Sequence, residues 1–276
     1  MSANTLAQTV GRAPELPPSR AYGQNLADLD LDFGLPNRPA LVTHVLARCC
    51  TNAGQPVAAI TEAMWNLPLG ARIVRLLRIV SLTTREERLT MALSCPQSGC
   101  RKTFEVSPAF ADLLADAPDE TNLAKIVQFP LSEAAALSLR LPTGRDQAEW
   151  QGRTYNTPDD AVRSIVQSLI TSAPPGVEAT LPEKIANLST VMAEADPLTS
   201  FHIATTCPHC EQPVDIAVDL EAVALAQLAT HRRSLLRDVH VLASRYGWSE
   251  ADVLAIPTER RQEYRRLIST EEDTLP

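Results

Sequence analysis

The chain of 276 residues lacks any long uninterrupted run of apolar residues, and its first residues lack the charged-then-apolar layout of a signal peptide. A membrane-spanning helix needs about 20 predominantly apolar residues, so the sequence predicts no such helix and no membrane partner. The chain also lacks an excess of positive charge, since its formal net charge is −8. This balance argues against broad electrostatic binding to nucleic acid. We therefore expect a protein that acts in a reducing cytoplasm.

Motifs of the common catalytic centres are missing as well. The sequence has no glycine-rich phosphate loop, no Gly-x-Ser-x-Gly nucleophile elbow and no His-Glu-x-x-His metal motif. A triad assembled in space from distant residues cannot be seen in one sequence. The lack of a visible centre nevertheless favours a protein that is not an enzyme.

Four of the six cysteines form two close pairs, Cys95 with Cys100 and Cys207 with Cys210. Each pair lies beside sequence that alternates between apolar and polar residues, as β-strands do. A tetrahedral zinc site takes four thiolate or imidazole ligands at about 2.3 Å, and two short turns can deliver two sulfurs each. We therefore predict that these four cysteines bind one structural Zn²⁺ ion as a split zinc ribbon, with one pair in the turn of each of two β-hairpins.

The two pairs are separated by 106 residues, where an ordinary ribbon has roughly a dozen to twenty. A separate unit must therefore interrupt the ribbon. Lengthening the closed loop to about a hundred residues costs only about 2 kcal/mol of entropy, whereas structural zinc contributes on the order of 10 kcal/mol. Disulfide or redox use of the thiols remains an alternative, although neither pair opens a βαβ pattern. A catalytic zinc is disfavoured because four sulfurs fill its coordination shell.

The remaining segments predict an α+β, mostly helical fold around the two hairpins. Residues 1–36 hold four prolines and three aspartates without helical periodicity, and we expect a flexible or surface-draped arm there. Apolar spacing predicts an N-terminal helical layer at 37–87, in which Cys49 and Cys50 are buried thiols. The other predicted segments are a first hairpin at 88–107, an inserted helical unit at 108–198, a second hairpin at 199–219 and a C-terminal helical arm at 220–276.

Within the insert the pattern predicts helices at 108–115, from 158 to the Pro174-Pro175-Gly176 break, and at 182–195, and a strand at 137–141. In the C-terminal arm an apolar stripe at steps of three and four predicts one long helix from Leu220 to Tyr246. Its seam either packs within the chain or meets another chain, and His231 on the stripe is expected to be half-buried and structural. Gly247 is suited to end this helix, and Ser249 with Asp252 resembles a capping box.

Two groups of basic residues stand out in the acidic chain. Solvated faces are the ordinary explanation for them, docking onto an acidic partner is the alternative, and a nucleic-acid-binding ribbon would use the same patches. Trp248 similarly either closes the core between two helices or anchors an interface. The first group is Arg72, Arg75, Arg78, Arg85, Arg88, Arg101 and Lys102, and the second is Arg260, Arg261, Arg265 and Arg266.

The order of several short motifs resembles a known family. Over about residues 38 to 268, the chain is similar to the baseplate hub assembly chaperone family of contractile-tailed phages, with relatives encoded beside phage-tail-like contractile injection systems. The motifs that carry the resemblance are Trp-Asn-Leu-Pro-Leu-Gly-Ala-Arg at 65–72, Ala-Glu-Ala-Asp-Pro-Leu at 193–198 before Cys-Pro-His-Cys at 207–210, Asp-Val-His at 238–240, Tyr-Gly-Trp-Ser at 246–249, Leu-Ala-Ile-Pro at 254–257 and Arg-Arg at 260–261.

The resemblance implies a protein that helps to build a tail baseplate through contacts with hub, spike or wedge proteins and without catalytic turnover. Such a protein acts in the cytoplasm of the host or producer cell and either leaves or remains in the tail particle. Only the cysteines carry over residue by residue, and the first pair departs from the commoner Cys-x-x-Cys by having four intervening residues. The alternative function is that of a zinc-ribbon nucleic-acid-binding or transcription-associated protein. The sequence leaves the oligomeric state open.

Overall fold

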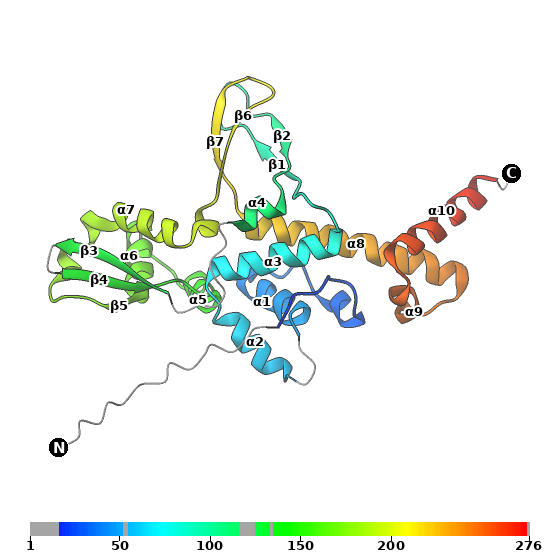
Figure 1. The fold of residues 1–276 in the computed structure, drawn as a ribbon, viewed down its shortest axis with the longest axis horizontal. Coiled ribbons are helices and arrows are strands. Elements are labelled where there is room, and N and C mark those ends of the chain that lie inside the picture. The colour runs from blue at the N-terminus through cyan, green and yellow to red at the C-terminus, as the bar shows by residue number, and fades with distance from the viewer. Residues whose placement is uncertain (1–16, 52–54, 116–124, 133–134, 275–276) are drawn as a thin grey trace, which may run out of the picture.

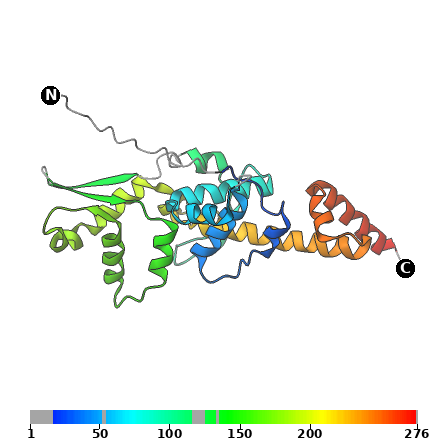
Figure 2. The ribbon, with the colours of Figure 1, turned by 90° about the horizontal axis from the view of Figure 1, so that it is seen from below.

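The computed structural model describes residues 17–51, 55–115, 125–132 and 135–274, and shows a mostly helical α+β protein with small antiparallel sheets. A helical body lies at the centre, two β-hairpins project from it, and further units extend to either side (Figure 1). The view turned by 90° shows the same elongated arrangement (Figure 2). The predicted α+β, mostly helical class is confirmed.

The body consists of three helices and the first part of a fourth. Asn37 caps the first helix, because its side chain accepts a hydrogen bond from the Ala40 N–H at 3.0 Å. The third helix is buried on most of its faces, since the first helix and the fourth pack against it. The four helices are α1 (Arg38–Cys49), α2 (Val57–Trp65), α3 (Leu69–Thr84) and α8 (Leu220–Tyr246).

The segment that precedes α1 packs onto the body. Residues 17–36 include a short 3₁₀ helix, η1 (Leu26–Asp30), and Tyr22 and Leu31 are buried in the main core. The prediction of a flexible or surface-draped arm therefore does not hold for these residues, while residues 1–16 lie outside the described part.

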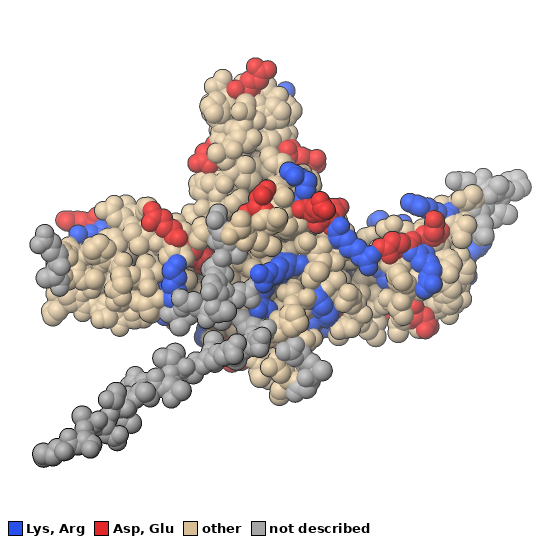
Figure 3. All heavy atoms as spheres, viewed as in Figure 1, with Lys and Arg blue, Asp and Glu red and all other residues tan. Residues whose placement is uncertain are grey.

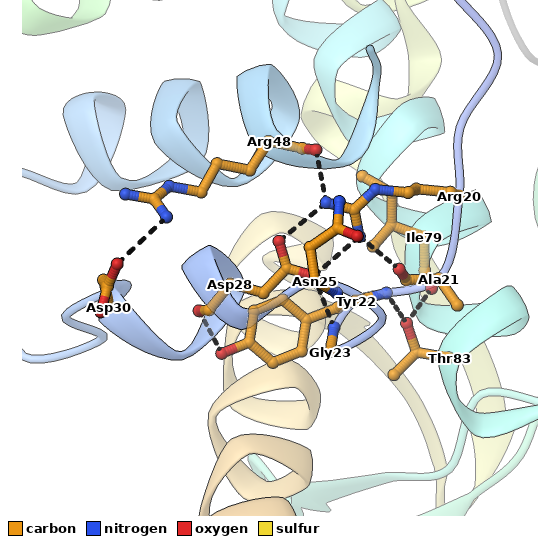
Figure 4. A network of polar contacts seen from close by, with 10 residues as sticks. All are labelled: Arg20, Ala21, Tyr22, Gly23, Asn25, Asp28, Asp30, Arg48, Ile79 and Thr83. Atoms are coloured by element: carbon orange, nitrogen blue, oxygen red, sulfur yellow. Dashed lines mark hydrogen bonds and ion pairs between the residues drawn. The ribbon is translucent and has the colours of Figure 1, made fainter. Parts of the chain in front are cut away.

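A partly buried ion pair holds this segment on the body. Both guanidinium Nη atoms of Arg20 donate to the carboxylate of Asp28 at 2.7 Å, and Asp28 is fully buried (Figure 4). Arg20 also donates to the carbonyl oxygen of Arg48 at the end of α1, and the amide of Gly23 donates to Asp28 at 2.9 Å. Polar contacts therefore anchor this segment. Such contacts leave no periodic spacing of apolar residues in the sequence, so the sequence pattern did not predict them.

The two predicted hairpins are present, each as a separate two-stranded antiparallel sheet. Leu93 faces Phe104 in the first hairpin and Thr205 faces Val214 in the second. Leu93, Phe104 and Val214 are buried and belong to the main core, so the inner faces of the hairpins continue that core outward. The strands are β1 (Met91–Ser94), β2 (Thr103–Val106), β6 (His202–Thr206) and β7 (Pro213–Ala217).

The unit between the hairpins differs from the helical insert that the sequence predicted. It contains a three-stranded antiparallel sheet in the order β3-β4-β5. The predicted strand at 137–141 corresponds to β4, whereas β3, β5 and α5 were not predicted, and α7 begins at residue 177 instead of 182. The elements are α4 (Phe110–Ala115), β3 (Ile126–Ser132), β4 (Ala135–Arg140), α5 (Gly144–Gln151), α6 (Pro158–Leu169), β5 (Ile170–Ser172) and α7 (Val177–Ala195).

This unit has a core of its own. One face of β4 supplies Leu137 and Leu139, which are fully buried, and α6 and α7 pack their apolar sides onto it. A short 3₁₀ helix, η2 (Pro197–Ser200), leads from α7 to the second hairpin. The insert is therefore a small α+β unit that separates the two hairpins.

The C-terminal arm follows the prediction closely. Helix α8 spans Leu220–Tyr246 and Gly247 ends it with a φ of 69°. Ser249 and Asp252 form the predicted capping box at the start of α9 (Glu250–Ala255), and α10 (Thr258–Thr274) completes the arm. His231 is half-buried, with its ring 6.3 Å from that of Tyr22. In the described part of the chain, no helix has the length and apolar character needed to cross a bilayer.

Candidate metal centre

The turns of the two hairpins bring four sulfur atoms together. The Sγ atoms of Cys95, Cys100, Cys207 and Cys210 all lie within 4.8 Å of one another. The Cys95–Cys210 distance is 3.8 Å and the Cys100–Cys207 distance is 3.9 Å. A disulfide bond would be about 2 Å long, so these thiols are free. A tetrahedral ion with bonds of about 2.3 Å to sulfur places its ligands about 3.8 Å apart, and the observed spacing fits it.

The two turns bond to themselves in the same way although their lengths differ. The amide of Cys95 donates to the carbonyl oxygen of Lys102 at 3.0 Å, and the amide of Cys207 donates to that of Gln212 at 3.0 Å. Each bond closes the mouth of its turn just before the strands begin to pair. The first turn accommodates its two additional residues without changing this closure.

The residue after the second cysteine of each pair has a left-handed backbone. Arg101 has a φ of 50° and Glu211 a φ of 56°. A non-glycine residue reaches this region at a cost of about 1 kcal/mol or more, so it persists only where the surroundings require it. The repetition at equivalent positions shows that the two turns share a conformation that directs two sulfurs inward.

The local electrostatics favour a cation among the sulfurs. Burial opposes ionisation of Cys207, but hydrogen bonds from the backbone N–H groups of His209 and Cys210 outweigh it and lower the pKa to about 6. Burial and the neighbouring sulfurs of Cys207 and Cys210 raise the pKa of Cys95 to about 12. Cys207 therefore ionises readily to a thiolate, whereas ionisation of Cys95 beside it is opposed. A divalent ion that prefers thiolate ligands would remove this repulsion.

One further contact joins the two turns. The Nε2 atom of His209 lies 3.1 Å from the carbonyl oxygen of Thr103, so the second turn is tied to the first hairpin beside the sulfurs. No pattern in the sequence predicts this role of His209. Cys49 and Cys50 are fully buried in the main core, and burial raises the pKa of Cys49 to about 12. These two cysteines are the buried thiols that the sequence predicted.

The basic group predicted around the first cysteine pair is not one surface. Arg72 is completely buried, and Arg75 is nearly so. The guanidinium of Arg72 donates to the carbonyl oxygens of Pro39 and Met64 and to the Thr43 hydroxyl, at 2.7 to 3.0 Å. The sequence predicted either a solvated face or a docking patch for these arginines. Both predictions are wrong for Arg72 and Arg75, because both side chains are buried.

The second basic group is divided in the same manner. Arg261 is 5% exposed, and its guanidinium donates to the carbonyl oxygen of Ile256 at the end of α9. Arg265 donates to the carboxylate of Asp238 at 2.6 Å, which ties α10 to α8. Arg260 and Arg266 are exposed.

Comparison with known proteins adds no relative, because no family model, no curated protein and no solved structure matches the chain. Any function must therefore be inferred from the site and from the resemblance of the short motifs.

Proposed function

We propose that Cys95, Cys100, Cys207 and Cys210 bind one zinc ion and that the two hairpins form a split zinc ribbon. The spacing of the four sulfurs supports this proposal, together with the free state of the thiols and the backbone amides that stabilise a thiolate at Cys207. Sulfur ligands select zinc over magnesium or calcium. Four protein ligands leave no position for water, so the ion would be structural.

The proposal predicts about one zinc ion per purified chain, measured by elemental analysis. Iron and copper are measured in the same sample, because both also bind thiolates. A metal-free preparation in which both hairpins are folded would overturn the proposal.

The same sulfur cluster supports a role as an adaptor. It joins two segments separated by 106 residues at the outer end of the projecting hairpins, and the hairpins, the insert and the C-terminal arm extend from the helical body in different directions (Figure 1). A molecule with several outlying surfaces is suited to hold other proteins in a fixed arrangement. With the resemblance of its motifs, this leads us to infer a non-enzymatic adaptor or chaperone in baseplate assembly of a contractile phage tail or injection system.

Its partners would be hub, spike or wedge proteins of that machine, and its site of action the cytoplasm in which the machine is assembled. The test is to purify the tagged full-length chain from producing cells at high salt and to identify co-purifying proteins by mass spectrometry. We expect baseplate proteins to remain bound in high salt. Analysis of finished tail particles for the chain distinguishes a transient chaperone from a retained component.

Nucleic-acid binding through the ribbon is the alternative outcome of the same experiment. On the face shown in Figure 3, the projection carries few basic side chains and has acidic ones at its outer end. The described turns and strands of the hairpins carry the exposed acidic residues Glu105, Glu211 and Asp215 as well as the exposed Arg101 and Lys102. DNA or RNA binding that weakens steeply with salt, without any captured baseplate protein, would replace the adaptor by this alternative.

A further inference from the structure

Three aromatic rings meet where the helices of the C-terminal arm join. Tyr246 and Trp248 stack with their ring centroids 4.6 Å apart, and Tyr264 meets both rings edge-on at 5.8 and 5.2 Å. Tyr246 ends α8, Trp248 lies in the turn before α9, and Tyr264 lies on α10. The chain has only three Trp, four Tyr and five Phe residues, so one quarter of them gather at this place.

The aromatic cluster covers a small core on one side and faces solvent on the other. Val239, Leu242, Val253 and Ile268 form the core beneath it. Tyr246 is 39% exposed, and Trp248 and Tyr264 are half-buried. Leu267, next to the buried Ile268, is 56% exposed and lies one turn after Tyr264 on α10. Apolar side chains therefore extend from this small core onto the exposed surface of α10.

The polar atoms of these rings are not engaged within the protein. Among the described residues, neither the hydroxyls of Tyr246 and Tyr264 nor the indole N–H of Trp248 has a hydrogen-bond partner. By contrast, the indole of Trp150 in the insert donates to the Ser168 hydroxyl at 3.1 Å. Three donors are thus available beside an apolar surface.

One arginine at the same place also lacks a carboxylate. Arg260 lies one turn before Tyr264 on α10 and is exposed, and it forms no ion pair with a described residue. The other arginines of this helix are paired, Arg261 and Arg265 with Asp238 and Arg266 with Glu263. An unpaired guanidinium next to exposed rings favours a carboxylate from another molecule.

We propose that this surface is the docking site for a baseplate protein whose contact region presents an apolar side chain flanked by a carboxylate. Tryptophan, tyrosine and arginine are the residues that dominate binding energy at protein interfaces. The arm extends away from the ribbon and the insert, so a partner can reach it without contacting either (Figure 1). The inference rests on the adaptor function proposed above. The docking surface consists of Tyr246, Trp248, Arg260, Tyr264 and Leu267.

The test compares substitutions on and off this surface in the full-length tagged chain. Leu267→Asp and Arg260→Glu each place a carboxylate on the surface, and both side chains are exposed, so the fold should be kept. We expect each to lower the captured amount of a hub, spike or wedge protein about tenfold in quantitative mass spectrometry. The matched controls are Val57→Asp on α2, where Val57 is 67% exposed, and Arg237→Glu on α8, and both should bind as the wild type does.

The outcomes separate the two proposals. If the wild type captures no baseplate protein, the adaptor function fails and the docking site fails with it. If the wild type captures one and both surface variants do so equally well, the function stands and the docking site is overturned. Light scattering completes the test, because a wild-type dimer that Leu267→Asp dissociates would show that the occupant is a second copy of this chain. Such a dimer would also overturn the proposal.

Discussion

The two hairpins and the helical body are ordered by different means. Helix α3 is buried on most of its faces, whereas each hairpin strand has only four or five residues and buries no more than every second one. An isolated two-stranded hairpin is at best marginally stable in water. The body is thus stabilised by apolar burial, while we expect the hairpins to depend on the link between their turns. Substitutions that act on one region and spare the other test this difference.

The largest expected effect comes from removing one sulfur of the cluster. Cys207→Ala leaves three ligands, and structural zinc contributes on the order of 10 kcal/mol in small zinc domains. We expect loss of the metal and loss of amide protection across residues 88–107 and 199–219, with the helices of the body still protected. Hydrogen exchange read by mass spectrometry measures both regions at once.

The matched control is Cys49→Ala, which removes a fully buried thiol from the main core. It should keep the metal and the protection of both hairpins, and lower the free energy of unfolding by about 1 kcal/mol. If Cys207→Ala and Cys49→Ala gave the same exchange pattern in the hairpins, the distinction between hairpins and body would be lost.

The next effect concerns the body. Arg72→Met removes a guanidinium that is 0% exposed, and leaves the oxygens of Pro39, Met64 and Thr43 without their donor. Burial lowers the pKa of Arg72 to about 10, so the cation is itself costly and its removal offsets part of the loss. We expect the free energy of unfolding to fall by about 3 kcal/mol in urea titrations.

The metal content of Arg72→Met should equal that of the wild type, because the cluster lies outside the body. Arg237→Met, at an exposed arginine of α8, should change stability by less than about 0.5 kcal/mol. Equal urea midpoints for the two variants would show that the buried arginine does not support the body.

A smaller effect is expected where the insert meets the body. The amide of Gly70, at the start of α3, donates to the carboxylate of Asp196 at 3.0 Å. A Cβ atom at position 70 would lie 1.7 Å from Asp196 Oδ1, so Gly70→Ala forces the two segments apart. We expect a loss of about 2 kcal/mol in the free energy of unfolding.

Gly152→Ala is the control for this joint, since a Cβ atom there would lie 3.5 Å from the nearest atom, Glu149 O. Thermal unfolding should rank Gly70→Ala well below Gly152→Ala and the wild type. If Gly70→Ala unfolded at a higher temperature than Gly152→Ala, the protein would relieve the close contact at position 70 without losing stability.

The features that the sequence predicted well are those with a short period or a defined spacing. The stripe from Leu220 to Tyr246 predicted α8 with its true bounds, and Gly247 and the Ser249–Asp252 capping box correctly marked the end of α8 and the start of α9. The cysteine pairs were likewise brought together as expected. For the helix and its caps the local residues are sufficient to determine the local structure, whereas the two cysteine pairs were matched because a tetrahedral site takes four ligands.

The features that it missed depend on partners distant in the chain. Arg72 resembles a surface charge in the sequence, but α1 and α2 supply oxygens around it, and the ion pair of Arg20 with Asp28 follows no periodic pattern. The unpredicted strand β3 contains Pro130, whose missing N–H is tolerated because β3 lies at the edge of its sheet. The identity of the metal and of the partners remains a prediction.

The smallest expected effect is a pH dependence at the joint between insert and body. Burial raises the pKa of Asp196, despite the hydrogen bond from the Gly70 amide and the charge of Lys125. The folded state therefore binds the proton more tightly than the unfolded state, so this carboxyl lowers stability as the pH rises from its unfolded pKa of about 3.9 through its folded pKa. Asp196→Asn should gain up to about 1 kcal/mol over the wild type at pH 7.5 and almost nothing at pH 4.5.

Measuring both proteins at each pH cancels the effects of metal loss and of other carboxyls, because only the difference between them reports on Asp196. The buried Oδ1 atom of Asp196 has no hydrogen-bond partner among the described residues, so the charged form gains little there to offset its burial. A variant less stable than the wild type at pH 7.5 would mean that the ionised carboxylate stabilises the joint. The insert would then be attached by charge at the start of α3, and apolar burial would no longer suffice to explain how the body holds its parts together.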